Sequence, residues 1–138
     1  MTEPIVHSQG MQKAKTIVVW VLQALLCLQF TLVGTGKFMD RVWAPRFRNW
    51  GYPEHFYQVI GVLELLGGLS LLVPRLAGYG AAVLMVIMIG ATATHLVHGE
   101  RWTSPVFPLV LLSVVAATRL RFRRRQDTAA VNHSTRTA

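Results

Sequence analysis

The residue whose type and position most clearly indicate chemistry is Glu64, the single carboxylate inside an apolar stretch that runs from Val59 to Val73. An ionisable side chain within a membrane span costs about 2.5 to 3.5 kcal/mol on insertion scales, so it generally faces the interior of a bundle and has a partner. We expect that partner to be Lys37 or His95. A purely structural role, in which the same contact only holds helices together, is the competing interpretation.

Other polar and aromatic residues are predicted to reach the same level as Glu64. A small-molecule site of this kind combines an apolar channel with a few hydrogen-bonding groups and a group that can carry a proton. Glu64 and His95 are the candidate proton carriers, and no catalytic residue can be assigned beyond them. The candidate ligand-binding residues are Gln29, Lys37, Trp50, Tyr52, Glu64, Thr92 and His95.

A metal site is a weaker hypothesis for the same region. His95 and His98 are three residues apart and can share a helix face, and Glu64 or Glu100 could supply a third ligand. A histidine near a membrane boundary is more often an interfacial residue, so we expect no metal. Cys27 is the single cysteine, which excludes an internal disulfide and an all-cysteine metal site.

The composition indicates the elements that must position these residues. Of 138 residues, 52% are apolar and 14% are charged, with 14 Lys and Arg against 6 Asp and Glu. Soluble domains carry about 25% charged residues. The cations gather at the ends of four apolar blocks, which is typical of a membrane protein and argues against a soluble nucleic-acid binder.

The four apolar blocks predict an all-α fold, an integral membrane four-helix bundle in one domain. The predicted spans are Ile17–Val33, a helix from about Pro53 to Val73, Leu76–Leu96 and Pro105–Thr118. The first span is long for a signal peptide and is not followed by an Ala-x-Ala site, so we expect it to be uncleaved. The predicted segments are a polar cytoplasmic segment, 1–16, the membrane domain, 17–119, and a basic, disordered cytoplasmic tail, 120–138.

The distribution of cations predicts the orientation. With four spans, nine Lys and Arg residues lie on the side of the termini and five on the other side. The positive-inside rule then places both termini in the cytoplasm. We therefore expect a multi-pass protein of the cytoplasmic (inner) membrane, with Glu64 and His95 in its outer half.

The outer loop between the first two spans, Lys37–Tyr57, has a pattern of its own. Trp43, Phe47 and Trp50 are spaced i, i+4 and i+7, which predicts a short amphipathic helix lying at the interface over the mouth of the bundle. A simple interfacial belt of Trp43, Trp50 and Trp102 would also account for these aromatic residues.

Several motifs together resemble the DoxX family of small bacterial membrane proteins over Thr16 to Arg119. They are Gly36–Phe38 (GKF), Gly51–Pro53 (GYP), Ile60–Gly68 (IGVLELLGG), Leu72–Arg75 (LVPR) and Gly90–Leu96 (GATATHL). The resemblance implies a four-helix membrane bundle with Glu64 and His95 as polar core positions. The family is named for its likeness to a membrane subunit of a thiosulfate:quinone oxidoreductase, and related proteins are linked to thiol and oxidative-stress complexes or to the assembly of other membrane proteins.

Residues and resemblance together predict a redox-associated membrane subunit that binds a quinone-like or amphipathic small molecule in an outer-leaflet pocket around Glu64 and His95. As an enzyme it would be at most one subunit of an oxidoreductase complex, with no covalent cofactor and with a quinone or lipid as ligand. Expected partners are the lipid bilayer, other membrane or redox proteins and a second copy of the chain, but no nucleic acid. The alternatives are a noncatalytic assembly or scaffolding protein and a small proton-coupled transporter.

Overall fold

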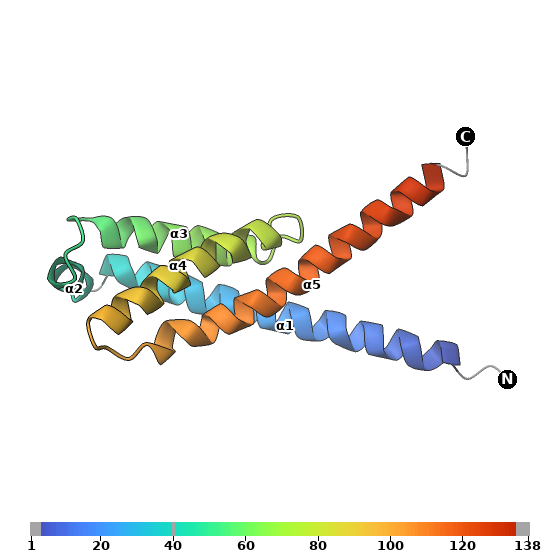
Figure 1. Ribbon diagram of the computed structural model, residues 1–138, viewed down its shortest axis with the longest axis horizontal. Helices are drawn as coiled ribbons and strands as arrows, with labels where there is room; N and C mark the ends of the chain where they lie inside the picture. Colours follow the sequence, from blue (N-terminus) through green and yellow to red (C-terminus); the bar gives the residue numbers. More distant parts are fainter. Residues whose placement is uncertain (1–3, 40, 135–138) are drawn as a thin grey trace.

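The computed structural model describes residues 4–39 and 41–134, and every regular element in them is a helix (Figure 1). The helices are α1 (Pro4–Met39), α2 (Trp43–Asn49), α3 (Phe56–Ser70), α4 (Ala77–Val97) and α5 (Thr103–Ser134). The predicted all-α fold is confirmed. The short helix predicted between the first two spans is present as α2, and α4 lies within one residue of its predicted bounds.

Helix α3 is shorter than the predicted span at both ends. It begins at Phe56 because His55 has a left-handed backbone with φ 68°, and Pro53 belongs to the preceding turn, where its carbonyl accepts the Phe56 N–H at 3.2 Å. A positive φ at a residue other than glycine is uncommon and interrupts a helix. At the other end the N–H of Val73 bonds to the Ser70 carbonyl at 3.1 Å, a tightened turn directly before Pro74.

Helices α1 and α5 are longer than predicted. Residues 4–16 of the predicted polar segment form the start of α1, and α5 continues past Arg119 as far as Ser134. The prediction of a disordered tail is therefore wrong for residues 120–134, whereas 135–138 lie outside the described residues. Propagating an existing helix needs no new nucleus, and Arg, Gln and Ala have high helix propensity, so a basic polar sequence continues α5 readily.

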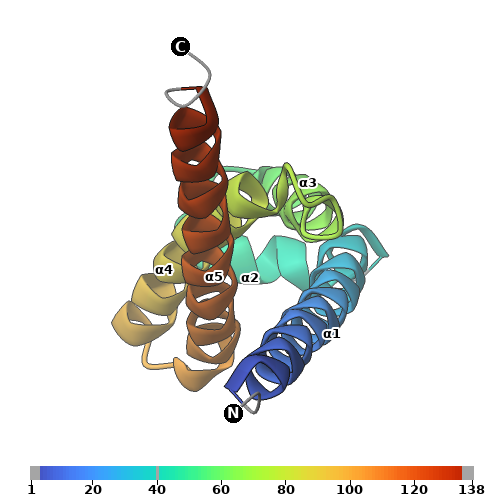
Figure 2. The ribbon, with the colours of Figure 1, turned by 90° about the vertical axis from the view of Figure 1, so that its right-hand side faces the viewer.

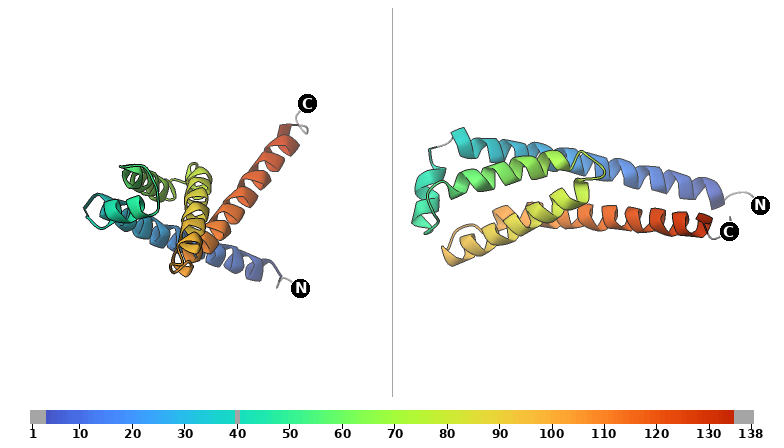
Figure 3. Two further views of the ribbon diagram at one scale, coloured as in Figure 1. Left: turned by 60° about the vertical axis from the view of Figure 1, so that its left-hand side comes forward. Right: turned by 90° about the horizontal axis from the view of Figure 1, so that it is seen from above.

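The long helices form two layers, α1 on α3 and α4 on α5 (Figure 3). Glycines bring α1 and α3 close together: a Cβ added at Gly34 would lie 2.8 Å from the Gly61 carbonyl oxygen, and one added at Gly61 would lie 3.2 Å from Lys37 Cβ. Small residues permit such approaches between membrane helices. This approach brings Lys37 of α1 beside α3.

The two layers meet at one end and diverge at the other. Near the α3–α4 turn, a Cβ at Gly80 would lie 2.9 Å from the Gly67 carbonyl oxygen, so α3 and α4 touch there. Towards their other ends α3 and α4 separate, and α2 lies across the gap (Figures 1 and 3). The view along the bundle shows α2 between the two layers (Figure 2). We call this the α2 end; α1 and α5 project from the opposite end, the terminal end.

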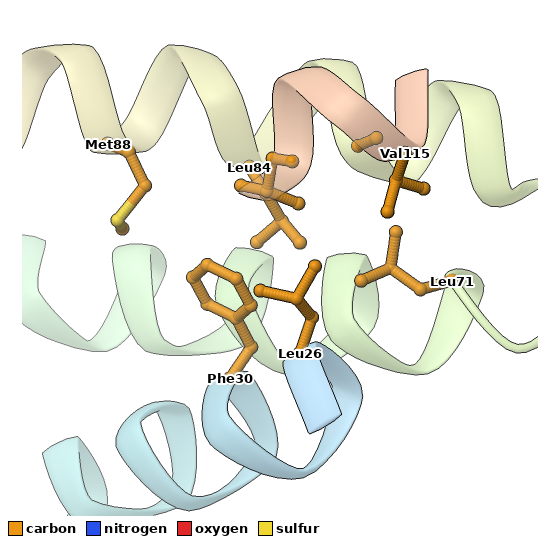
Figure 4. Close-up of a cluster of buried hydrophobic side chains, with 8 residues drawn as sticks. Leu26, Phe30, Leu71, Leu84, Met88 and Val115 are labelled. Carbon is orange, nitrogen blue, oxygen red and sulfur yellow. The ribbon is translucent and has the colours of Figure 1, made fainter. Parts of the chain in front are cut away.

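The apolar core fills the middle of the bundle between the layers. Leu26 and Phe30 of α1 point towards Leu84 and Met88 of α4, with Leu71 and Val115 beside them (Figure 4). These side chains are almost completely buried. The core therefore separates the α2 end from the terminal end.

The helices are apolar enough for a membrane, although they differ in length. Within the described residues, Lys13–Met39 and Ala77–Val97 are long and apolar enough to cross a bilayer, whereas Phe56–Ser70 and Thr103–Arg119 are apolar but shorter. Many large apolar side chains face outwards, as on a surface in contact with lipid. The architecture is compatible with the predicted membrane helical bundle.

Candidate functional site

A cavity of about 460 Å³ lies at the α2 end, between the two layers and beneath α2. All five helices contribute to its wall, which is mostly aliphatic and aromatic. A few polar side chains interrupt this wall. Apolar walls with a small number of placed polar groups are typical of small-molecule sites.

The most buried polar pair of the cavity wall is Lys37 and Glu64. The Lys37 ammonium donates a hydrogen bond to Glu64 Oε2 in a direct ion pair, and each side chain is only 4% exposed. Lys37 Nζ also lies 4.6 Å from the centre of the Trp43 ring, a cation–π contact. Because Lys37 is in the last turn of α1, the helix dipole also favours its charge there.

Helix α2 covers the cavity with a cluster of rings centred on Phe47. The Phe47 ring is buried, and its centre lies 5.3 Å from that of Trp50, 5.5 Å from that of Tyr52 and 6.1 Å from that of Tyr57. Trp43 and Phe56 complete the cluster at 6.2 Å each. The i, i+4, i+7 pattern thus forms one packed face, which lies on the cavity.

Glu100, in the turn between α4 and α5, ties α2 to the α4–α5 layer. Its Oε1 accepts a hydrogen bond from Trp50 Nε1 at 3.2 Å. Its Oε2 lies 3.3 Å from an Arg46 guanidinium nitrogen and 3.1 Å from His95 Nδ1. Arg46 of α2, Trp50 directly after α2 and His95 of α4 therefore all lie against one carboxylate, which connects α2 to the α4–α5 layer above the cavity.

Six of the seven predicted ligand-binding residues line this cavity: Gln29, Lys37, Trp50, Tyr52, Glu64 and His95. Thr92 does not; its hydroxyl donates to the Met88 carbonyl at 2.7 Å within α4. Thr94 lines the wall instead, and its hydroxyl lies 2.6 Å from that of Tyr52. The spacing of Gly90, Ala91, Thr94 and His95 along α4 is the signal that could have identified Thr94 in place of Thr92.

The two candidate proton carriers have different partners. Of the two partners considered for Glu64, the structure pairs it with Lys37, while His95 lies against Glu100. His98 Nδ1 lies 2.8 Å from the Thr94 carbonyl oxygen. Within the part of the chain that the structure describes, no three His, Cys, Asp or Glu side chains are grouped as metal ligands would be.

A second polar cluster, which sequence reasoning missed, lies at the terminal end. Gln23 is fully buried; its Nε2 donates to the Leu71 carbonyl at 2.9 Å, and its Oε1 accepts a hydrogen bond from the Arg119 guanidinium. That guanidinium lies 5.3 Å from the centre of the Trp20 ring. The cluster joins α1 to α5 and to the end of α3. A glutamine inside the first apolar block was the available signal.

Fold and cavity together define a small helical membrane protein with a largely apolar chamber at one end, whose wall carries a few polar side chains. A protein-family model described as the DoxX-like family matches residues 21–118. The match covers well over half of the chain, so the protein belongs to the DoxX-like family, as the motifs around Glu64 and His95 predicted. No curated protein and no solved structure shows a significant match.

Proposed function

We propose that this protein is a redox-associated membrane subunit that binds a quinone-like or other amphipathic small molecule in the cavity, with the head group against Lys37 and Glu64. The observation that carries the proposal is the buried Lys37–Glu64 pair in an otherwise apolar and aromatic wall. A volume of about 460 Å³ falls in the range of about 300 to 1,000 Å³ typical of small-molecule sites.

The pair has the chemistry that a quinone head group requires. A quinone carbonyl oxygen accepts hydrogen bonds, and an ammonium carries three N–H donors. Glu64 accepts one of them in this structure. Glu64 and His95 line the same cavity and are the groups that would hold or release protons as the head group changes its charge. Two electrons and two protons convert a quinone to a quinol, and we assign the electron donor to a partner redox protein.

The proposed location is the bacterial cytoplasmic membrane, with both ends of the chain in the cytoplasm. The unequal distribution of cations along the sequence supports this orientation. The free ends of α1 and α5 both project away from α2 (Figure 1), which an even number of spans requires. In this orientation the cavity belongs to the outer leaflet.

Native mass spectrometry of the protein released from nanodiscs containing decylubiquinone tests the binding. We expect a one-to-one adduct whose affinity falls at least tenfold in Glu64→Gln, because the neutral amide no longer forms the charge-assisted hydrogen bond that holds the Lys37 ammonium at the cavity wall. Loss of such a bond costs about 1.5 to 3 kcal/mol. Glu54→Gln is the matched control, since Glu54 is exposed and pairs with Arg48 outside the cavity. Equal binding by stable Glu64→Gln and Glu54→Gln proteins would show that Glu64 is only a contact between helices.

One observation favours the alternative role as a noncatalytic assembly or scaffolding protein. The arms of α1 and α5 project beyond the packed part of the bundle and diverge (Figure 1). Lys13, Lys15 and Arg121 on these arms are exposed. If this is the function, truncation after Leu120, which removes Arg121 and the rest of the α5 arm, should abolish capture of a membrane partner, while Glu64→Gln should leave that capture unchanged.

A further inference from the structure

The wall of the cavity is incomplete on the side where α3 and α4 separate. At the terminal end these helices touch through Gly67 and Gly80, where an added Cβ at Gly80 would lie 2.9 Å from the Gly67 carbonyl oxygen. At the α2 end they diverge (Figures 1 and 3). The cavity occupies this wider part, so its side wall depends on the side chains along the edges of the two helices.

The side chains along this edge face outwards and line the cavity at the same time. Val59 of α3 and Val86 of α4 both belong to the cavity wall, yet they are 52% and 70% exposed. Leu63 is also exposed, and a Cβ added at Gly90 would meet no atom within 4 Å. Open space at Gly90 and exposed wall residues on both helices indicate a lateral opening.

The route from the aqueous side is covered. Helix α2 lies over the cavity with the Phe47 ring cluster packed beneath it, and Glu100 holds Trp50 and Arg46 in place. Tyr52 adds a hydroxyl contact to Thr94 of α4 at 2.6 Å. A solute from water would have to break these contacts, whereas a molecule in the bilayer would meet the exposed side chains of Val59, Leu63 and Val86 and the open space at Gly90.

We propose that the gap between α3 and α4, bordered by Val59, Leu63, Val86 and Gly90, is a lateral portal through which the ligand enters from the bilayer. The inference rests on the proposed function and specifies its substrate class: a lipid-soluble molecule whose polar head reaches Lys37 and Glu64 while its apolar tail passes out through the portal. The tail stays in an apolar environment throughout, so binding does not require it to be transferred into water.

The matched test places the same substitution at two open glycines of α4. Gly90→Phe fills the portal, whereas Gly78→Phe adds an equal side chain near the terminal end, where an added Cβ also meets no atom within 4 Å. The background is Trp20→Phe/Trp102→Phe, so that Trp43 and Trp50 near the cavity report binding. Quenching of their emission is titrated in nanodiscs with decylubiquinone and with ubiquinone-0, which has the same head group and no tail.

Gly90→Phe should weaken decylubiquinone binding about tenfold, or about 1.4 kcal/mol, and leave ubiquinone-0 affinity unchanged. Gly78→Phe should bind both probes as the parent does. Unchanged decylubiquinone affinity in Gly90→Phe overturns the portal. Val33 lines the cavity from α1, away from the gap between α3 and α4. If Val33→Phe weakened decylubiquinone binding while Gly90→Phe did not, the portal would also be overturned. If the parent binds neither probe, the proposed function itself fails.

A second pair of variants decides the matter if Gly90→Phe does not fold. Val59→Phe narrows the portal from α3, and Val62→Phe adds the same volume to an exposed position of α3 that does not line the cavity. We expect the tailed probe to lose affinity in the first variant and not in the second. Equal affinities in the two variants would contradict the portal.

Discussion

The bundle has a polar cluster around Gln23 at its terminal end and the buried Lys37–Glu64 pair at its α2 end, and the two differ in their surroundings. At the terminal end, both polar atoms of the Gln23 amide have protein partners: the nitrogen donates to the Leu71 carbonyl, and the oxygen accepts from Arg119. At the α2 end, the described residues supply one hydrogen-bond acceptor, Glu64, for the Lys37 ammonium, and both residues line a cavity. An ammonium has three N–H donors, and on the proposed function the ligand head group accepts from one that Glu64 does not use.

On the proposed function, the space around a buried polar group, and not its residue type, separates a contact between helices from a binding site. Gln23 lies one turn from Leu26, at the edge of the packed core. Lys37 and Glu64 lie where the layers have already separated. We therefore expect Gln23, which is surrounded by packed side chains, to hold helices together, and Glu64, which borders a cavity, to bind a ligand. The variants below test this distinction.

The largest effect is expected from breaking the α2-end pair on one side only. Lys37→Met leaves the Glu64 carboxylate buried without its cation, which typically destabilises a protein by about 3 to 5 kcal/mol. We expect a lower midpoint in thermal unfolding in detergent and loss of decylubiquinone binding.

The double variant Lys37→Met/Glu64→Leu sharpens this result. Replacing a buried ion pair by apolar residues is often neutral or stabilising. The double variant should therefore regain most of the thermal stability and still not bind decylubiquinone. Recovery of binding together with stability would mean that the pair only supports the fold.

An intermediate effect, on stability alone, is expected at the terminal end. Gln23→Leu leaves the Leu71 carbonyl and the Arg119 guanidinium without this partner, at a cost of about 1 to 3 kcal/mol. Thermal unfolding measures the loss, and Gln58→Leu, at a half-buried position of α3, should lose less. Decylubiquinone affinity should stay at the wild-type value; a parallel fall in affinity would refute the separation of the two clusters.

The smallest effect is expected for Glu100→Gln, which weakens the attachment of α2. The Arg46–Glu100 pair is partly exposed, and such pairs contribute about 0 to 1 kcal/mol. The unfolding midpoint should hardly change, but amide hydrogen exchange in Trp43–Asn49 should become faster. Glu54→Gln, which removes an exposed pair with Arg48, should leave exchange in the middle of α2 slow. Identical exchange in both variants would argue against a role for Glu100 in holding α2.

Much of the fold could be predicted because apolar periodicity locates helices. Helix α4 differs by one residue from its prediction, and the aromatic spacing from Trp43 to Trp50 located α2. The ends of α1 and α5 could not be predicted in this way, since their polar sequences carry no hydropathy signal. The start of α3 was misplaced because Pro53 suits the first turn of a helix, but the left-handed His55 follows it.

The candidate site was predictable in its residue types but not in its pairings. An isolated carboxylate identified Glu64, yet the choice between Lys37 and His95 as its partner depended on how closely α1 and α3 approach at Gly34 and Gly61. Thr92 was chosen over Thr94 because Thr92 lies one turn before His95, whereas the face of α4 that lines the cavity carries Gly90, Ala91, Thr94 and His95. The Gln23–Arg119 contact joins residues 96 positions apart, which no local pattern reveals.

The most direct test of the central claim compares two tryptophans, since each polar cluster has one beside its cation: Trp43 near Lys37 and Trp20 near Arg119. Single-tryptophan proteins retaining either residue are titrated with decylubiquinone in nanodiscs, and the saturable part of the quenching is measured. We predict saturable quenching of Trp43 that Glu64→Gln weakens, and only non-saturable quenching of Trp20 by probe in the bilayer. Equal, non-saturable quenching of both tryptophans would contradict a binding site at the α2 end.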